Sequence, residues 1–220
     1  TIFHETMRSL YTGEEAMSVD FFFDPKMPDN GLKDAPLRFV TRDYIKSWLL
    51  REGDIRAKVK ALIMNEMNVL EISGRNLVVA DVIVKYVKKT LSCDLEVLRE
   101  NDVPHFIMHG LENRVTRTVF GQKFKGYIDR LDSVKAGETR VVDYKTGKVL
   151  ENDENINDDN AIDIAGMIFD PSCKERPKIA LQFFIYDMLL QDDPRVEGSG
   201  IANSVYSTAN LFKNKPETYK

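Results

Sequence analysis

The sequence predicts an α/β fold in which a small mixed β-sheet is flanked by helices. Three observations support this class. Apolar residues recur at helical spacing through most of the first hundred positions. Aromatic and β-branched residues, broken by turn signals, then follow from Pro104 to Thr146. A strongly apolar helical segment and one more strand come last, and a succession of this kind is typical of a sheet covered by helices.

Length and composition favour one globular domain. The chain has 220 residues, of which 43% are hydrophobic and 30% charged, so it can bury a sizeable core. We expect a single domain over residues 1–220, cut from a longer chain, with residues 41–100 as a helical insertion. No stretch approaches the ~18 apolar residues of a membrane span and no signal peptide is visible, so we expect a cytoplasmic protein without membrane contact.

Charge and cysteine content exclude several classes of site. The net charge of −4 excludes a globally basic nucleic-acid binder, so any contact with DNA would need a local basic groove. Cys93 and Cys173 are too few for a disulfide framework or a tetrahedral cysteine site. We therefore expect reduced thiols and no iron–sulfur cluster.

Four helices are expected before the sheet. The segment Ile2–Tyr11 carries an apolar face and places His4 beside it; a single histidine of this kind is usually a partly buried side chain with a polar partner. Thr41 can cap a helix that runs to about Glu52, with Gly53 as its stop. Two further helices are expected over residues 55–67 and 77–91. Their lysines either form a solvated face or flank a DNA path: Lys58, Lys60, Lys85, Lys88 and Lys89.

The segment 123–146 reads as a β-hairpin with reactive side chains. If residues 134–138 form the loop, Ser133 pairs with Thr139 and Asp129 stands opposite Asp143. Two carboxylates would then lie within roughly 5 Å at Cβ and repel each other. A hard divalent cation removes that repulsion and prefers oxygen ligands. Asp143 and Lys145 share a face because side chains alternate along a strand, although solvated surface charges would give the same pattern.

The remaining elements complete the expected fold. Residues 105–120 read as an irregular strand, on which Glu112 is either an additional active-site carboxylate or a solvated side chain. Loops are expected over residues 24–36 and 151–160; the second is acidic but lacks the glycine and the final glutamate of an EF-hand loop. Helices over residues 162–169 and 178–190 and a strand over 201–206 follow.

The hairpin resembles the PD-(D/E)XK nuclease superfamily, specifically its RecB/AddB-like branch. That branch carries Gly-x-Ile-Asp-Arg-hydrophobic-Asp, here residues 126–132, and then Val-Asp-Tyr-Lys-Thr-Gly, here residues 142–147. It also has a histidine on an early helix, matched by His4, and a Gln-x-x-x-Tyr on a later helix, matched by Gln182 and Tyr186. Four motifs in the right order cover the chain from His4 to Tyr186.

The resemblance implies a restriction-endonuclease-like core and a metal-dependent DNA nuclease, an exonuclease module of a helicase–nuclease in double-strand-break repair. It implies that His4, Asp129, Asp143 and the Tyr144 carbonyl hold Mg²⁺ or Mn²⁺, and that Lys145 acts in catalysis. DNA and a helicase subunit, or the rest of a longer chain, are the implied partners.

Gln182 and Tyr186 lie one turn apart on an otherwise apolar helix, so their polar ends need partners. Either they serve the active site, with Gln182 orienting water or Lys145 and Tyr186 touching the substrate backbone, or they are satisfied core residues. Two other functions stay open. One is a catalytically silent DNA-binding or scaffold module, and the other is an unrelated metal-dependent phosphohydrolase acting on nucleotides.

Overall fold

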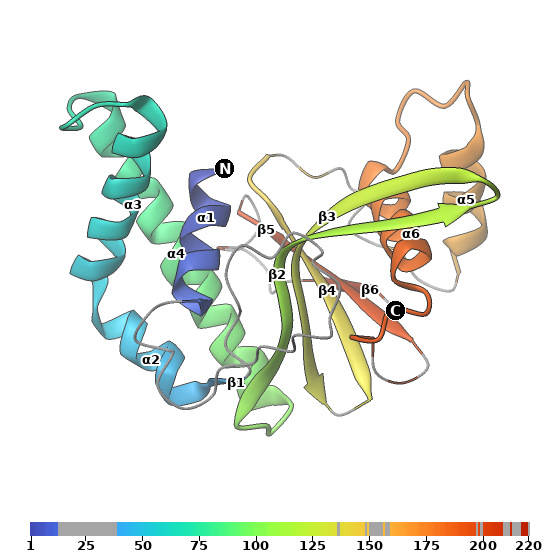
Figure 1. The fold of residues 1–220 in the computed structure, drawn as a ribbon, viewed down its shortest axis with the longest axis horizontal. Coiled ribbons are helices and arrows are strands. Elements are labelled where there is room, and N and C mark those ends of the chain that lie inside the picture. Colours follow the sequence, from blue (N-terminus) through green and yellow to red (C-terminus); the bar gives the residue numbers. More distant parts are fainter. Residues whose placement is uncertain are drawn as a thin grey trace.

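The structure is a computed structural model that describes residues 1–12, 39–135, 137–147, 149, 156, 159–196, 198, 200–208, 212 and 217–219. The predicted loop over residues 24–36 and most of the acidic loop over 151–160 lie outside these ranges. Within them, a mixed sheet is flanked by helices on both faces, which confirms the predicted fold class (Figure 1). No helix in the described ranges is both long enough and apolar enough to cross a membrane.

The sheet has the strand order β1-β2-β3-β4-β5-β6. Its strands are β1 (Phe39–Thr41), β2 (His105–Val119), β3 (Gln122–Lys135), β4 (Glu138–Lys145), β5 (Ile201–Ser207) and β6 (Glu217–Tyr219). All neighbours are antiparallel except β4 and β5, which are parallel. The short edge strands β1 and β6 were not predicted, because three residues are too few to show an alternating pattern.

The helices before β2 form one group. They are α1 (Ile2–Tyr11), α2 (Arg42–Leu50), α3 (Glu52–Met67) and α4 (Arg75–Glu100). The bounds of α1 and the Thr41 cap are confirmed, since the Thr41 hydroxyl accepts a hydrogen bond from the Tyr44 amide. Gly53 was wrongly predicted to end α2. The helix breaks earlier, at Arg51, and Gly53 lies in the first turn of α3, where the chain is already helical again.

The helix α4 is longer than predicted at both ends. It continues beyond residue 91 because its apolar stripe goes on through Cys93, Leu95 and Leu98, all of which are buried. The interruption that suggested an end is Asp94, which is itself fully buried. After the sheet, α5 (Ala161–Phe169) and α6 (Lys178–Leu190) lie close to their predicted bounds.

Two hydrophobic clusters lie on opposite sides of the sheet. One joins α1–α4 to side chains of β2, β4 and β5, among them Phe106, Tyr144 and Tyr206. The other joins α6 to Ile128, Leu131 and Val141. The sheet is therefore covered by the helical group on one face and by α6 on the other, as Figure 1 shows.

The strand β2 changes the face that it presents partway along its length. Leu111 packs with the α1–α4 cluster, whereas Val115, four residues on, packs with α6. An even separation along a regular strand would keep both on one face. The change occurs at Glu112, whose φ of 48° lies in the left-handed region that glutamate seldom adopts. This irregularity re-aims the side chains beside the predicted site.

Candidate active site

The β3–β4 hairpin brings the two predicted aspartates together. Ser133 pairs with Thr139 and Arg130 with Val142, so continuing this register by one position sets Asp129 against Asp143. The predicted loop over residues 134–138 was too long, because Lys135 still pairs with Glu138 after a register shift behind Ser133. Beyond Arg130 the ladder is replaced by a side-chain contact: Asp129 Oδ2 accepts a hydrogen bond of 2.7 Å from the Tyr144 amide.

The helix α1 places His4 against Asp129. The Nε2 atom of His4 lies 3.2 Å from Asp129 Oδ2, and its Nδ1 contacts the Thr1 hydroxyl. Burial alone would lower the pKa of His4, but the neighbouring Asp129 and Glu112 carboxylates outweigh burial and raise it. The predicted α1 histidine thus lies at the same place as the hairpin carboxylate.

Asp143, Lys145 and Gln182 form a closed triangle. Lys145 Nζ lies 2.6 Å from Asp143 Oδ2 and donates to Gln182 Oε1 at 2.7 Å. The side-chain amide of Gln182 donates to Asp143 Oδ1 at 2.9 Å. Burial raises the pKa of Asp143, and the charge on Asp129 raises it further. The α6 glutamine therefore holds both the carboxylate and the ammonium of the Asp-x-Lys segment.

Tyr186 connects the same triangle to β3. Its hydroxyl accepts a hydrogen bond of 2.5 Å from Gln182 Nε2 and donates to the Tyr127 carbonyl at 2.5 Å. The hydroxyl thus has two partners inside the protein, and a contact between Tyr186 and a substrate stays a prediction. Gly126 leaves the space that this packing needs, since a Cβ there would lie 2.9 Å from Leu189 Cδ1.

Glu112 joins the site from β2. The β2–β3 register that pairs Arg114 with Tyr127 sets Glu112 opposite Asp129 when continued by two positions. Burial and then the charge on Asp129 raise the pKa of Glu112 to about 7. The sequence left Glu112 open between an active-site and a solvated role; the structure places it among the site carboxylates.

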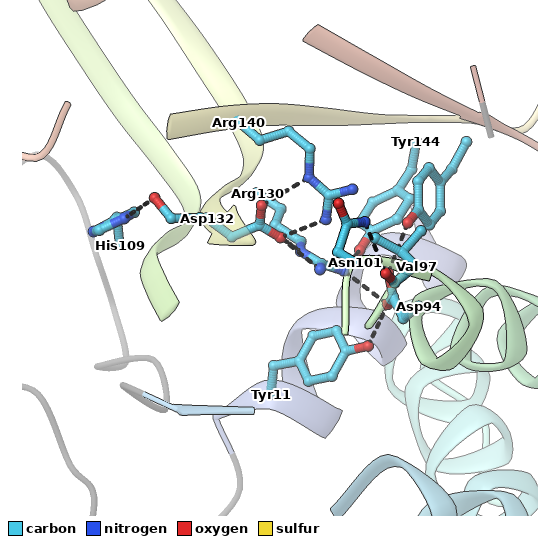
Figure 2. A network of polar contacts seen from close by, with 11 residues as sticks. Tyr11, Asp94, Val97, Asn101, His109, Arg130, Asp132, Arg140 and Tyr144 are labelled. Carbon is cyan, nitrogen blue, oxygen red and sulfur yellow. Dashed lines mark hydrogen bonds and ion pairs between the residues drawn. The ribbon is translucent and has the colours of Figure 1, made fainter. Parts of the chain in front are cut away.

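A buried polar network lies behind the hairpin (Figure 2). Arg130 donates to Asp132 from Nε at 2.5 Å and to Asp94 of α4 from Nη1 at 2.8 Å. Arg140 also donates to Asp132, at 2.9 Å from both Nε and Nη2. Three tyrosine hydroxyls complete it. Those of Tyr11 and Tyr206 donate to Asp94 and that of Tyr144 lies 3.4 Å from Arg130 Nη1.

This network overturns the interpretation of Arg130 and Asp132 as surface charges. Both side chains are fully buried. Burial opposes ionisation of Asp132, but the guanidinium groups of Arg130 and Arg140 hold its pKa below the usual range. Asp94 was not recognised as part of the site, since a carboxylate amid polar α4 residues gives no sequence signal of its contact with a strand. Tyr144 packs its ring into the same region, so only its backbone can serve the site.

The donor set fits a hard divalent cation in kind. Asp129, Asp143 and Glu112 provide carboxylate oxygens whose mutual repulsion raises two of their pKa values, and His4 adds an imidazole. Within the described ranges, no three His, Cys, Asp or Glu side chains form a group that could hold a metal ion as they stand. The structure gives the reason: His4 and Asp129 contact each other, while Asp143 is engaged with Lys145 and Gln182.

Comparison with known proteins identifies the family. The model of the PD-(D/E)XK nuclease superfamily matches residues 1–220, the whole chain. No curated protein and no solved structure gives a significant match. The match agrees with the mixed sheet flanked by helices and with the Asp129, Asp143 and Lys145 cluster at the end of its central hairpin. This chain belongs to the PD-(D/E)XK nuclease superfamily, whose members typically use divalent metal ions.

Proposed function

We propose that this chain is a metal-dependent DNA nuclease domain that hydrolyses phosphodiester bonds. The observation that carries the proposal is the joining of four separate segments at one point. His4 comes from α1, Asp129 from β3, Asp143 and Lys145 from β4, and Gln182 from α6. Folding has brought carboxylates, an imidazole and an ammonium group together at a cost in repulsion, and a site for a cation and a phosphate accounts for that cost.

Each side chain has a distinct proposed role. His4, Asp129, Asp143 and the Tyr144 carbonyl would hold Mg²⁺ or Mn²⁺, with Glu112 available as a further carboxylate. When bound, such an ion polarises a phosphoryl oxygen and lowers the pKa of water. Lys145 would hold the attacking water and offset the charge that develops on the phosphate. Gln182 already contacts Lys145 and Asp143, so it would fix the direction of the ammonium group.

The finer proposal is an exonuclease module of a RecB/AddB-like helicase–nuclease that acts in the cytoplasm on double-strand breaks. It is supported by the four ordered motifs of the sequence, and its partner would be a helicase subunit or the remainder of a longer chain. We further propose that residues 1–220 are one nuclease domain in which residues 41–100 are an insertion. The packing of α2–α4 with α1 on one face of the sheet supports this.

A cleavage assay tests the proposed function. End-labelled linear DNA, closed circular DNA and free nucleotides are incubated with the chain in Mg²⁺, in Mn²⁺ and in excess EDTA. We expect metal-dependent cleavage of linear DNA, with circular DNA spared if the enzyme needs an end. Cleavage of both forms would indicate an endonuclease. Hydrolysis of nucleotides alone would indicate a phosphohydrolase, and binding without any cleavage a silent scaffold.

A further inference from the structure

The distal half of the β2–β3 hairpin forms an arm that leads away from the catalytic carboxylates. Figure 1 shows it extending beyond the other strands and over α6. One face of the arm packs on that helix: a Cβ on Gly126 would touch Leu189 and Tyr186, and Arg117 Nη1 donates to the Met188 carbonyl at 2.8 Å. Val115, opposite Gly126, is buried in the same cluster.

Because side chains alternate along a strand, the other positions of the arm point away from α6. Going outward from Asp129, β3 places Tyr127, Lys125 and Lys123 on this face. Their partners on β2 are Arg114, Thr116 and Thr118, in that order. We call Arg114, Lys123, Lys125 and Tyr127 the arm row. It starts beside Glu112 and Asp129 and reaches about 20 Å from the carboxylates, at roughly 3.4 Å per residue.

The arm row is exposed and its charges are available. Arg114, Lys123 and Lys125 are exposed, and 55% of Tyr127 is open to solvent. No hydrogen bond or ion pair joins the three cations to another residue in the part of the chain that the structure describes. On a chain of net charge −4, this is a local positive strip that begins where negative charge is concentrated.

A second basic region is less suited to a polyanion. The groove between α3 and α4 has a volume of about 450 Å³ and is lined by Arg56, Lys85, Lys88 and Lys89. Two of these cations are already engaged, since Lys88 pairs with Glu52 and Arg56 with both Glu52 and Asp81. The local charge of this groove is therefore largely balanced, in contrast to that of the arm row.

We propose that the arm row binds one strand of DNA and guides it to the catalytic carboxylates. The cations would contact successive phosphates, and the exposed Tyr127 ring next to the site would stack on a base. A row one side chain wide per strand, with an aromatic ring at its inner end, fits a single strand better than a duplex. The proposal rests on the proposed function, because the row has this use only if the carboxylates act on DNA.

The test measures binding in EDTA, so that cleavage does not interfere. Fluorescence anisotropy follows a labelled single-stranded oligonucleotide and a duplex of the same length over a series of salt concentrations. The arm variant is Arg114→Gln/Lys123→Gln/Lys125→Gln. Its matched control is Lys46→Gln/Lys85→Gln/Lys174→Gln, which removes the same charge from exposed positions outside the arm. Melting temperatures verify that both variants are folded.

For the single strand, each lost phosphate contact reduces the slope of log K against log salt by about 0.7. We expect the arm variant to lose about 2 from this slope and the control to keep the wild-type value. Tyr127→Ala should weaken single-strand binding about 5- to 150-fold and leave the salt slope unchanged.

Equal slopes in the arm variant and the wild type would overturn the proposal while leaving the nuclease assignment intact, provided that the wild type cleaves DNA. An equal loss in the control, or a loss confined to the duplex, would also overturn it. If the wild type binds neither probe and cleaves no DNA, the proposed function fails together with the arm row.

Discussion

Asp143 lies at the centre of the site's interactions. It is 2% exposed, and its two oxygens contact Lys145 and Gln182, while the nearby Asp129 carboxylate disfavours its ionised form. A buried carboxylate that is both repelled and held in place is poised to gain from a cation. The first prediction concerns this residue.

Replacing Asp143 by alanine should abolish the binding of Mg²⁺ or Mn²⁺, because it removes the more buried of the two hairpin carboxylates. Isothermal titration calorimetry measures this directly. Asp43→Ala serves as control, since that carboxylate lies on the surface of α2 and pairs only with Lys46. Metal binding that persists in Asp143→Ala would rule out the proposed ligand set.

Lys145→Ala should keep the fold and the metal but slow cleavage by about 10²–10³-fold, the usual effect of removing a donor aimed at developing charge. Single-turnover cleavage rates measure the loss, and Lys46→Ala is the matched surface control. Near wild-type cleavage by the variant would make Lys145 a structural partner of Asp143 and nothing more.

Tyr186→Phe deletes only a hydroxyl that has two partners. Its removal leaves Gln182 Nε2 and the Tyr127 carbonyl each short of a bond, so we expect a loss of about 1–3 kcal/mol in unfolding free energy. Cleavage should also slow, because a freed Gln182 no longer fixes Lys145. Urea unfolding and kcat at saturating DNA separate the two effects. Reduced stability with an unchanged kcat would assign Tyr186 to the core alone.

At the scale of elements, the polar network attaches the sheet to its helices. Asp94 of α4 accepts hydrogen bonds from Tyr11 of α1, Arg130 of β3 and Tyr206 of β5, so one carboxylate connects four elements (Figure 2). Asp132 connects β3 to β4 through Arg130 and Arg140. The strand that carries Asp129 is thus fixed one residue beyond it.

Asp132→Asn should destabilise the protein by about 3–5 kcal/mol at pH 7, because it leaves two buried guanidinium groups short of a negative partner. Its folded-state pKa is depressed, so its contribution is present above its ordinary pKa of 3.8 and is lost as the pH falls through the lower folded value. The difference between variant and wild type should therefore shrink below about pH 4.

Denaturant unfolding as a function of pH measures that difference. The exposed pair of Asp43 and Lys46 provides the control, and Asp43→Asn should change the stability by less than about 1 kcal/mol. An effect of Asp132→Asn as small as that of the control would mean that the network does not hold the sheet to its helices.

At the scale of the whole molecule, the net charge of −4 opposes association with a polyanion. We therefore expect this chain alone to bind DNA weakly, with an affinity that falls steeply as salt rises, because the attraction comes from a few phosphate contacts. Anisotropy at 50 and 200 mM salt measures this. Tight binding that does not respond to salt would show that base or apolar contacts dominate instead.

The sequence by itself determined the local elements and the chemistry. Helical periodicity located α1 and α6, and turn signals with β-branched runs located β2, β3 and β4, since these patterns depend on neighbours along the chain. The register of Ser133 with Thr139 followed from hairpin geometry alone. The ordered motifs indicated the superfamily, which the family match over residues 1–220 confirms.

Only the tertiary structure decided which side chains meet across long separations. Asp94 and Arg130 are 36 residues apart, and Gln182 and Lys145 are 37 apart, and no local pattern encodes such contacts. The irregularity at Glu112 likewise arises where β2 passes from one hydrophobic cluster to the other, so it depends on packing on both faces of the sheet. Local patterns reflect backbone geometry, whereas charge pairing reflects where the folded chain excludes water.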